Sequence, residues 1–553
     1  MEKRTSQSLD SVSLEQAKDT KNNSKNYNIN EEFKHLEDEI KSNNQTEIGL
    51  QERTLNQVLS NIVRIDFYAE KQPKIKKWIK EYDVLYEKVF DDNAKPINKK
   101  SAAYKKIQLL KIKINSVKIS KQGYSVLVDK VFKRMVIELG LDLKVYNKEI
   151  FFYNKKYWQL ISEERFTSFL SDVSVKMGLT ELMYEHHTFG NDLIKQFTHK
   201  NFSQDIPSGN STFINLQNGT YKFKNGKGRL FKHYKSDNLH YVLPFDYNPK
   251  ETCPKFLEYL EYCLPDEDKR KVIQEFIGYV FTPNNVANLE KCLLLYGEGS
   301  NGKSVLYNII NALLGRENIS SYSIPQLTDR QKGEYYIINL QNKLLNYCSD
   351  TKGAFEDTGV FKQLVSGEKV TGRHPAGRPI EFQNNTKFIF NVNILPSTPE
   401  NIYGFFRRFE IIDFNVTIEE DKKDRQLATK IIGDELSGVF NWVLEGLNRL
   451  LQTKNLTHCK ANDEAMERFK IKSNNVLEFL TEDGYKVVND IEQGDIFNNL
   501  FSNYQVWIAV NGGRALKKSN FKERLDSIKL NGIQLYRSEK CNGNRHRINI
   551  TKM

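Results

Sequence analysis

The sequence predicts an α/β fold, and three observations support that prediction. The apolar run Lys291 to Tyr296 enters a glycine-rich turn, and a helix is expected from Val305 to Leu314. Two more short apolar runs, Leu344 to Asp350 and Lys387 to Asn393, have the length and composition of buried strands. The stretch Phe256 to Leu264 has apolar residues at helical spacing. Alternation of helices and strands is typical of α/β proteins that contain a parallel sheet.

The chain has 553 residues, which is long enough for several domains. Residues 1–53 are rich in Ser, Asn, Lys and Glu and hold few large apolar residues, which predicts a disordered polar tail. Residues 54–205 are predicted to form an α+β domain in which Phe151 to Trp158 is a hairpin turning at Asn154 and Lys155. The remaining expected boundaries are 206–285 for a hairpin plus a helical region, 286–451 for the α/β domain, 452–473 for a linker and 474–553 for a C-terminal domain.

The chain is basic, and its excess charge is uneven. It has 82 Lys and Arg against 70 Asp and Glu, a net charge of +12. Gly512 to Met553 alone holds 11 basic and 3 acidic residues, or +8 in 42 residues. Such a segment fits a nucleic-acid partner and equally fits a solvated charged face.

Targeting features are not evident, so a cytoplasmic location is expected. No run of eighteen apolar residues exists, which argues against a membrane span, and the first residues lack the apolar core of a signal peptide. None of the six cysteines forms a Cys-x-x-Cys pair, which argues against a zinc ribbon or a disulfide framework. A reducing compartment is the simple interpretation.

Residues 297–304 read Gly-Glu-Gly-Ser-Asn-Gly-Lys-Ser and meet the spacing G-x-x-x-x-G-K-[ST] of a phosphate-binding loop. Glycines allow a sharp turn that points backbone N–H groups at phosphate oxygens, and the following helix adds its positive end. Lys303 is expected to reach the β- and γ-phosphates of ATP, and the Ser304 hydroxyl to ligate Mg²⁺. The predicted nucleotide-binding residues are Gly297, Glu298, Gly299, Ser300, Asn301, Gly302, Lys303 and Ser304.

Polar residues end the next two strands, and a pair of arginines precedes a third. Asp350 is placed to hold Mg²⁺ or the attacking water. Asn393 either orients that water or caps a turn before Pro396. Arg407 and Arg408 suit the charge of a phosphoryl-transfer transition state, and surface ion pairs are the other interpretation, above all for one of the two.

A basic hairpin is predicted between the acid and the asparagine. Lys369 to Gly372 and Ile380 to Phe382 read as strands around a Pro/Gly turn, whose tip would display Arg373, His374 and Arg378. Such a hairpin can grip a phosphodiester backbone, and it can equally be a solvated loop.

This order of motifs resembles the superfamily 3 helicases of the AAA+ class. It is most similar to the phage, plasmid and poxvirus primase-helicase group, and within it to the MCM-like replication helicases of chromosomal islands and cassette elements. The resemblance covers about Val145 to the C-terminus. It depends on the 297–304 loop, Phe361-Lys362 with Gly367, Asn393 with Pro396, Arg407-Arg408, and, for a winged-helix tail, Leu500 to Trp507, Phe521 and Arg545 to Ile550.

The resemblance implies an AAA+ ATPase core with a C-terminal winged-helix domain, and ATP and Mg²⁺ as cofactors. It implies a ring-shaped homo-oligomer, expected to be a hexamer. The activity implied is 3′→5′ replicative helicase action for a mobile genetic element, with self-loading at an origin. An origin-binding initiator that barely translocates, or a primase-helicase, are the alternatives. The implied partners are single-stranded and duplex DNA and accessory replication proteins, without a membrane.

The resemblance also assigns residues. Because many relatives have Glu in place of Asp350, Glu356 and Asp357 are alternative acids. One of the two arginines would act on the site of a neighbouring subunit. The implied catalytic residues are Lys303, Asp350, Asn393, Arg407 and Arg408, with Ser304 and Asp350 at the metal. The implied DNA contacts are Lys369, Arg373, His374 and Arg378 in a pore hairpin and Lys517, Lys518, Lys522, Arg545 and Arg547 in the winged helix.

Overall fold

A computed structural model describes twelve stretches of the chain: residues 52–91, 94–146, 149–180, 187–203, 212–224, 227–351, 353–375, 377–396, 403–512, 515–530, 532–538 and 546–552. The expected polar tail therefore lies almost wholly outside the described residues. The chain divides into two compact units, Met1–Glu52 and Arg53–Met553, and every element named below belongs to the second. None of the described helices combines the length and the apolarity that crossing a membrane requires.

The N-terminal part of this unit packs helices on a three-stranded antiparallel sheet of order β1-β2-β3. Its core includes the buried rings of Phe132, Phe166 and Phe197. The predicted hairpin is confirmed, with a turn at 154–157 in which Lys155 has a φ of 74°. The elements are α2 (Phe67–Lys71), α3 (Ile75–Val89), α4 (Ala102–Ser116), α5 (Lys121–Glu138), β1 (Asp142–Tyr146), β2 (Glu149–Tyr153), β3 (Trp158–Ile161), α6 (Glu163–Lys176) and α8 (His187–Lys200).

A second antiparallel sheet, of order β4-β5-β6, precedes the larger α/β part. The side chain of Asn215 joins it to the following chain by donating to the Tyr241 carbonyl (2.8 Å). The backbone of Trp158 donates to the Leu239 carbonyl (2.8 Å), which ties the same chain to β3. The elements are β4 (Thr212–Leu216), β5 (Gly219–Lys224), β6 (Lys227–Phe231), η1 (Lys235–Asp237), α9 (Pro254–Cys263) and α10 (Glu267–Val280).

The centre of the unit is a five-stranded sheet of order β13-β7-β12-β9-β8, in which every pair is parallel. Its strands are buried almost throughout, as expected for a parallel sheet covered on both faces. All carboxyl ends consequently meet at one edge. The strands are β7 (Cys292–Tyr296), β8 (Ile319–Ser320), β9 (Leu345–Cys348), β12 (Lys387–Val392) and β13 (Phe409–Asp413).

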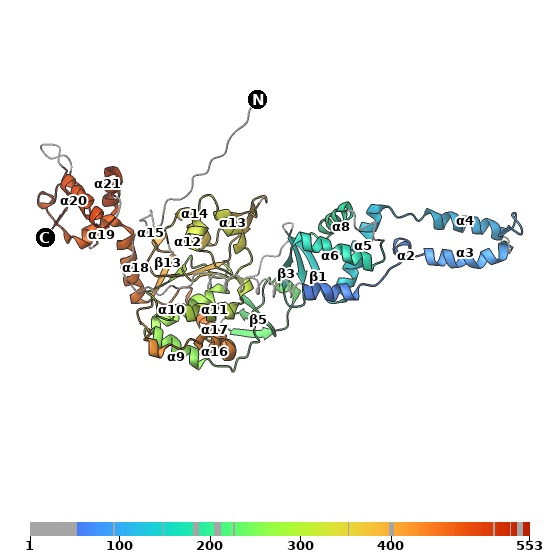
Figure 1. The fold of residues 1–553 in the computed structure, drawn as a ribbon, viewed down its shortest axis with the longest axis horizontal. Helices are drawn as coiled ribbons and strands as arrows, with labels where there is room; N and C mark the ends of the chain where they lie inside the picture. Colours follow the sequence, from blue (N-terminus) through green and yellow to red (C-terminus); the bar gives the residue numbers. More distant parts are fainter. Residues whose placement is uncertain are drawn as a thin grey trace, which may run out of the picture. The chain divides into compact units, whose positions relative to one another are not determined.

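Alternate residues of these strands face opposite layers. Leu293 and Leu295 pack with α10, α11 and α17, whereas Leu294 packs with α12 to α14. Figure 1 shows these two groups of helices on opposite sides of the sheet. The prediction of an α/β fold with a parallel sheet is confirmed. The remaining elements of this part are α11 (Lys303–Leu314), η2 (Arg316–Asn318), α12 (Ile324–Thr328), α13 (Gly333–Ile337), η3 (Ile338–Leu340), α14 (Thr358–Ser366), β10 (Lys369–Gly372), β11 (Ile380–Gln383), α15 (Tyr403–Phe406), η4 (Glu420–Lys422), α16 (Leu427–Asp434) and α17 (Leu436–Thr453).

Residues 460–473 of the expected linker form a helix, α18 (Lys460–Ser473), that packs on β13. Its Ala465 and Phe469 are buried in the same core as Leu294. The few apolar residues of this charged segment are spaced so that they form one narrow buried stripe on the helix. The polar composition of the segment as a whole hides this spacing and therefore predicted a linker. A separate core follows, in α19 (Asn475–Glu482), β14 (Tyr485–Val487), η5 (Ile491–Gln493), α20 (Phe497–Val510), α21 (Lys518–Ser527), β15 (Lys529–Leu530), β16 (Ile533–Gln534) and β17 (Ile550–Lys552).

One lysine sits inside the central sheet, at the first residue of β12. Lys387 is 4 % exposed, donates to Asn284 Oδ1 and lies 4.3 Å from the centre of the Tyr279 ring. Burial lowers the pKa of its ammonium from 10.5 to about 7. Because the unfolded state binds this proton more tightly, the free energy of unfolding should rise with pH between about 7 and 10.

We therefore expect Lys387→Met to stabilise the protein by about 2 kcal/mol at pH 6, since loss of the ring contact and the hydrogen bond offsets part of the removed desolvation cost. The gain should shrink above pH 7 by about 1.4 kcal/mol per pH unit and reverse in sign before pH 10, because the wild-type lysine is then neutral and keeps its contacts. Urea unfolding at pH 6, 7.5 and 9 measures it, with Lys369→Met, on an exposed strand position, as the matched control. A gain independent of pH would contradict the assignment of a buried charge.

Candidate functional site

The 297–304 loop joins the carboxyl end of β7 to α11, and its backbone demands glycine at two positions. Gly297 has a φ of 154° and Gly302 a φ of 91°. A Cβ on Gly297 would lie 2.6 Å from the Phe414 carbonyl oxygen, and one on Gly302 would lie 2.5 Å from Cys263 Sγ. Both values are below any contact that real side chains make. The glycines thus allow the loop to fold tightly over the start of the helix.

Lys303 is a buried cation inside this loop. Its side chain is 6 % exposed, and its Nζ donates to the Gly297 carbonyl (2.5 Å) and to Asn301 Oδ1 (3.1 Å). It makes no ion pair with a carboxylate of any described residue. Burial alone lowers the pKa of the ammonium. A buried charge without a counter-ion is costly, so an anion bound beside Lys303 would be strongly favoured.

Three hydrogen bonds fix the loop to its surroundings. Asn301 Nδ2 donates to the Phe414 carbonyl (3.2 Å), and the backbone of Ile418 donates to the Ser300 carbonyl (2.7 Å). On the other side, the Tyr259 hydroxyl donates to the Gly302 carbonyl (2.8 Å). The chain after β13 and helix α9 therefore hold the loop in one shape before any ligand arrives.

The strand ends bring Asp350 and Asn393 to the same place. The Gly297 N–H donates to the Val392 carbonyl (3.1 Å), and the Thr351 N–H donates to the Asn391 carbonyl (3.0 Å), which locks the ends of β7, β9 and β12 together. Asp350 and Asn393 are both exposed, and both line a cavity of about 890 Å³ that Lys303 and Ser304 also line. The four side chains thus share one space at the carboxyl edge of the sheet.

The alternative acids lie elsewhere. Asp357 is the N-cap of α14, where its Oδ1 accepts from the backbone of Gly359 (2.8 Å) and Val360 (3.1 Å). Neither Asp357 nor Glu356 lines the cavity, whereas Asp350 does. Of the three candidate carboxylates, the geometry favours Asp350.

Sequence reasoning missed a basic group that lines the far wall of this cavity. All but one of its members follow β13 and alternate with acids, so Lys430 pairs with Asp424 (2.6 Å) and Arg425 with Glu420 (3.3 Å), while Lys255 comes from α9. In the sequence, this mixture of acidic and basic residues looks like ordinary solvent-exposed surface. Only the fold brings the basic residues to the cavity that Lys303 also lines. The basic residues lining the wall are Lys255, Lys422, Lys423, Arg425 and Lys430.

The two arginines stand at the opposite edge of the sheet. They precede β13, which runs parallel to β7 for five residues, so roughly 16 Å of strand separates them from the loop end. Arg408 is buried and donates to Ser366 Oγ (2.9 Å), whereas Arg407 is exposed and pairs with Glu290 (3.1 Å). Arg408 therefore holds its own fold together, and Arg407 is the one that can face another molecule.

The predicted basic hairpin is present as β10 and β11, paired from Lys369 with Gln383 to Gly372 with Ile380. Arg373 turns back onto α13, where it pairs with Glu334 (3.2 Å) and lies 4.9 Å from the centre of the Tyr335 ring. Lys369, His374 and Arg378 are exposed. Arg373 thus anchors the hairpin, and the other three are available at its surface.

The C-terminal basic residues divide in the same way. Lys517, Lys518 and Lys522 are exposed at the start of α21. Arg547 instead donates to the Gly494 carbonyl (2.8 Å) and pairs with Glu492 (3.4 Å), so it braces the fold. Arg545 lies outside the described residues.

Two protein-family models match parts of the chain. A model described as "D5 N terminal like" matches residues 130–265, and a family of unknown function, DUF5906, matches residues 295–408. The second match includes the loop, Asp350, Asn393 and both arginines. Helix α9 lies inside the first matched segment, and helix α10 lies between the two segments.

Curated relatives are distant and viral. "Putative helicase L207/L206" of Acanthamoeba polyphaga mimivirus is 23% identical over 278 residues, covering 46% of this chain and 27% of the relative. "Putative primase C962R" of African swine fever virus is 23% identical over 225 residues, covering 38% of this chain and 23% of the relative. The chain spans only about a quarter of the length of these proteins.

Among solved structures, the C-terminal region of NrS-1 is similar to 75% of this chain over 98% of its own length, with 12% sequence identity and a TM-score of 0.42. Another form of that region, residues 305–718, gives a TM-score of 0.40. The "D5 N terminal like" segment and the viral relatives together show similarity to proteins of the primase-helicase kind.

Proposed function

We propose that this protein is an ATP-dependent replicative DNA helicase of a mobile genetic element, acting as a ring that moves 3′→5′ on single-stranded DNA. The observation that supports it best is the buried Lys303 without a counter-ion, in a cavity that Asp350 and Asn393 also line. The cavity lies at the carboxyl edge of a parallel sheet, which is where nucleotides bind in α/β proteins. Its volume of about 890 Å³ is in the range of small-molecule binding sites. The polarity, the ring and the hexamer come from the family resemblance.

The donor set fits ATP and Mg²⁺. The Ser304 hydroxyl and the Asp350 carboxylate are oxygen ligands of the kind that Mg²⁺ prefers, and both face the cavity. Mg²⁺ would neutralise charge developing on the transferred phosphoryl group. Lys303 would release its loop carbonyls and bind the β- and γ-phosphates, while the Asn393 side chain would orient the attacking water.

The proposed DNA contacts are the exposed cations of the hairpin and of α21. Lys369, His374 and Arg378 would follow the phosphates of a single strand, and the AAA+ core would move the hairpin as ATP is consumed. Helix α21, with Lys517, Lys518 and Lys522 at its start, would serve as the recognition helix of a winged-helix domain on duplex DNA. The likeness to a protein named as a helicase supports nucleic acid as the partner.

Fork substrates test the proposal directly. ATP hydrolysis and strand separation would be measured together on forks that carry either a 3′ or a 5′ single-stranded tail. Unwinding that needs both ATP and the 3′ tail is the expected result. DNA-stimulated hydrolysis without unwinding on either fork would support an origin-binding initiator instead. Hydrolysis indifferent to DNA would contradict both.

The name of the African swine fever virus relative favours one second candidate, a primase-helicase. Primer synthesis on a single-stranded template would identify it. The chain matches less than a quarter of that relative, so the residues that carry out priming in the relative need not lie in the shared segment.

A further inference from the structure

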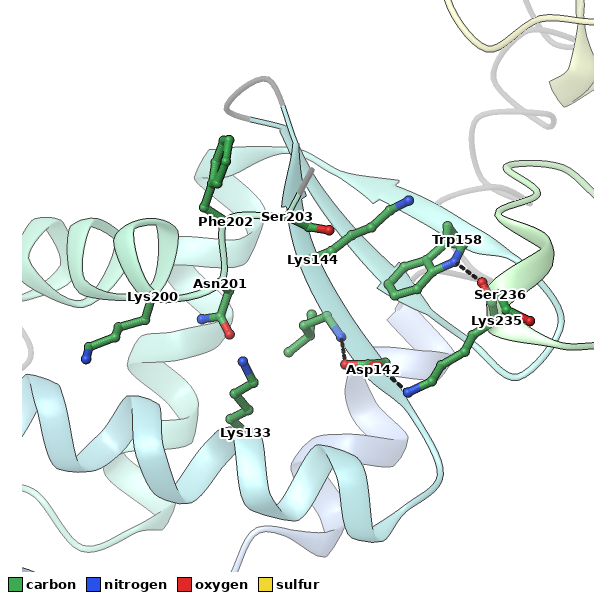
Figure 2. A pocket seen from close by; sticks show the side chains of 11 residues that line it. Lys133, Asp142, Lys144, Trp158, Lys200, Asn201, Phe202, Ser203, Lys235 and Ser236 are labelled. Atoms are coloured by element: carbon green, nitrogen blue, oxygen red, sulfur yellow. Dashed lines mark hydrogen bonds and ion pairs between the residues drawn. The ribbon is translucent and has the colours of Figure 1, made fainter. Parts of the chain in front are cut away.

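A second cavity, of about 360 Å³, lies within the segment that matches the "D5 N terminal like" model and apart from the loop of Lys303. It opens between α5, the end of α8, β1 and the short η1 (Figure 2). Basic and aromatic side chains dominate its wall. They are Lys133, Lys144, Lys200, Lys235, Trp158 and Phe202.

The four lysines are not equivalent. Lys235 pairs with Asp142 (2.6 Å), and Lys144 donates to Asn238 and lies 4.6 Å from the centre of the Trp158 ring. Lys133 and Lys200 make no hydrogen bond or ion pair with a described residue. Both lysines interact electrostatically with Asp129, a buried carboxyl whose pKa burial raises. Two ammonium groups therefore stand at the cavity without a carboxylate paired to either.

Two further features point to a ligand with both polar and aromatic groups. Asn201 is buried between these lysines, and its Nδ2 donates to the Phe197 carbonyl (2.8 Å), while its Oδ1 finds no donor among the described residues. Phe202, the next residue, is 67 % exposed. Figure 2 shows Lys133 rising from α5 toward Asn201, with Lys200 and Phe202 on either side of that residue.

We propose that this cavity binds one or two nucleotides of a single-stranded nucleic acid. Lys133 and Lys200 bind consecutive phosphates, the Phe202 ring stacks on an unpaired base, and Asn201 Oδ1 accepts from an amino or imino group of that base. A volume of about 360 Å³ suits a nucleotide and excludes a duplex. Stacking on an exposed ring requires a base that is not already paired. The site would hold the strand away from the ATPase cavity.

The test is equilibrium binding of a fluorescent oligo-dT by the full chain, without nucleotide, over a range of salt concentrations. Lys133→Gln with Lys200→Gln should weaken binding about ten-fold and reduce the salt slope by about 1.4, which is two single-strand phosphate contacts. Lys130→Gln with Lys195→Gln is the matched control, because these exposed lysines lie on α5 and α8 outside the cavity. It should change neither quantity.

Phe202→Ala provides an independent measurement, since this exposed ring contributes little to folding. Binding should weaken about ten-fold with the salt slope unchanged, and 5-iodouracil in the oligonucleotide should cross-link to Phe202 in the wild type. Equal losses in the two lysine pairs, or cross-links only elsewhere, would overturn the proposal. Pyrophosphate binding that depends on Lys133 and Lys200, with oligo-dT binding unaffected, would assign the cavity to small phosphate anions instead.

This inference rests on the proposed function only in taking nucleic acid as the ligand. Because the assay contains no ATP, a protein that fails to hydrolyse ATP or to unwind forks can still pass it. Conversely, an active helicase whose oligo-dT binding ignores the lysine pair and Phe202 would retain the proposed function and lose this site.

Discussion

Lys303→Met is expected to lower ATP hydrolysis by at least about a hundred-fold and to abolish fork unwinding, while binding of duplex DNA stays near the wild-type level. The physical reason is that the ammonium is the one cation buried in the described part of the loop and the only side chain there able to neutralise the phosphates as charge develops. The loss of ATP hydrolysis would be measured by phosphate release. The unchanged binding of duplex DNA would be measured by fluorescence anisotropy.

The stability of the same variant separates a ligand-binding role from a structural one. Burial lowers the pKa of Lys303, so its charge costs free energy in the folded state. Methionine fills a similar volume without charge. The thermal unfolding midpoint should therefore stay the same or rise. A wild-type rate of hydrolysis would refute the site, and a large fall in the midpoint would make loss of activity uninformative.

Arg407→Ala is expected to lower hydrolysis by about a thousand-fold without unfolding the protein. Its guanidinium is exposed at the edge of the sheet opposite the loop of the same chain, so the proposed function assigns it to the site of a neighbour, where an arginine of this kind has effects of that size. The decisive measurement is mixing. Arg407→Ala subunits supply an intact Lys303, and Lys303→Met subunits supply an intact Arg407, so the mixture should regain hydrolysis that neither variant shows alone.

Arg408→Ala is the matched control. It removes donors to Ser366 Oγ and to the Gly404 carbonyl from a side chain that is only 9 % exposed, so it should reduce the free energy of unfolding by about 2 kcal/mol. When Arg408→Ala is mixed with Lys303→Met, ATP hydrolysis should not exceed the hydrolysis that the folded Arg408→Ala molecules show alone. No recovery in the Arg407 mixture would show that the site does not draw on a neighbouring arginine.

The parts of this structure that sequence predicted are those encoded by neighbouring residues. The turn at Gly297 to Gly302, the strand before it and the hairpin at Lys369 to Gln383 each depend on a local period or a turn residue. The polar ends of β9 and β12 could be found because strand ends of a parallel sheet meet by geometry. What could not be predicted are contacts across hundreds of residues.

Two examples show why. Lys430 and Lys303 line one cavity because the chain after β13 returns over the loop, and nothing within the charged run 419–430 indicates that return. Lys133, Phe202 and Lys235 line one cavity but come from α5, the end of α8 and η1. In the sequence of each element alone, the lysines look like solvent-exposed surface residues. The structural roles of Arg373, Arg408 and Arg547 were hidden for the same reason, since their partners Glu334, Ser366 and Glu492 are not sequence neighbours.

The parallel direction of β7 and β13 constrains how copies of this chain can share a site. The loop and Arg407 are at opposite edges of one sheet, so a two-fold dimer whose interface holds only the loop edge of each sheet would set loop against loop and leave the proposed shared sites incomplete. A heterologous, head-to-tail interface, which either closes into a cycle or grows as an open helix, would bring the loop of one copy to Arg407 of the next. If a neighbour's Arg407 completes each site, as proposed, the catalytic rate per subunit should rise steeply with protein concentration, because an isolated protomer would hold no complete site.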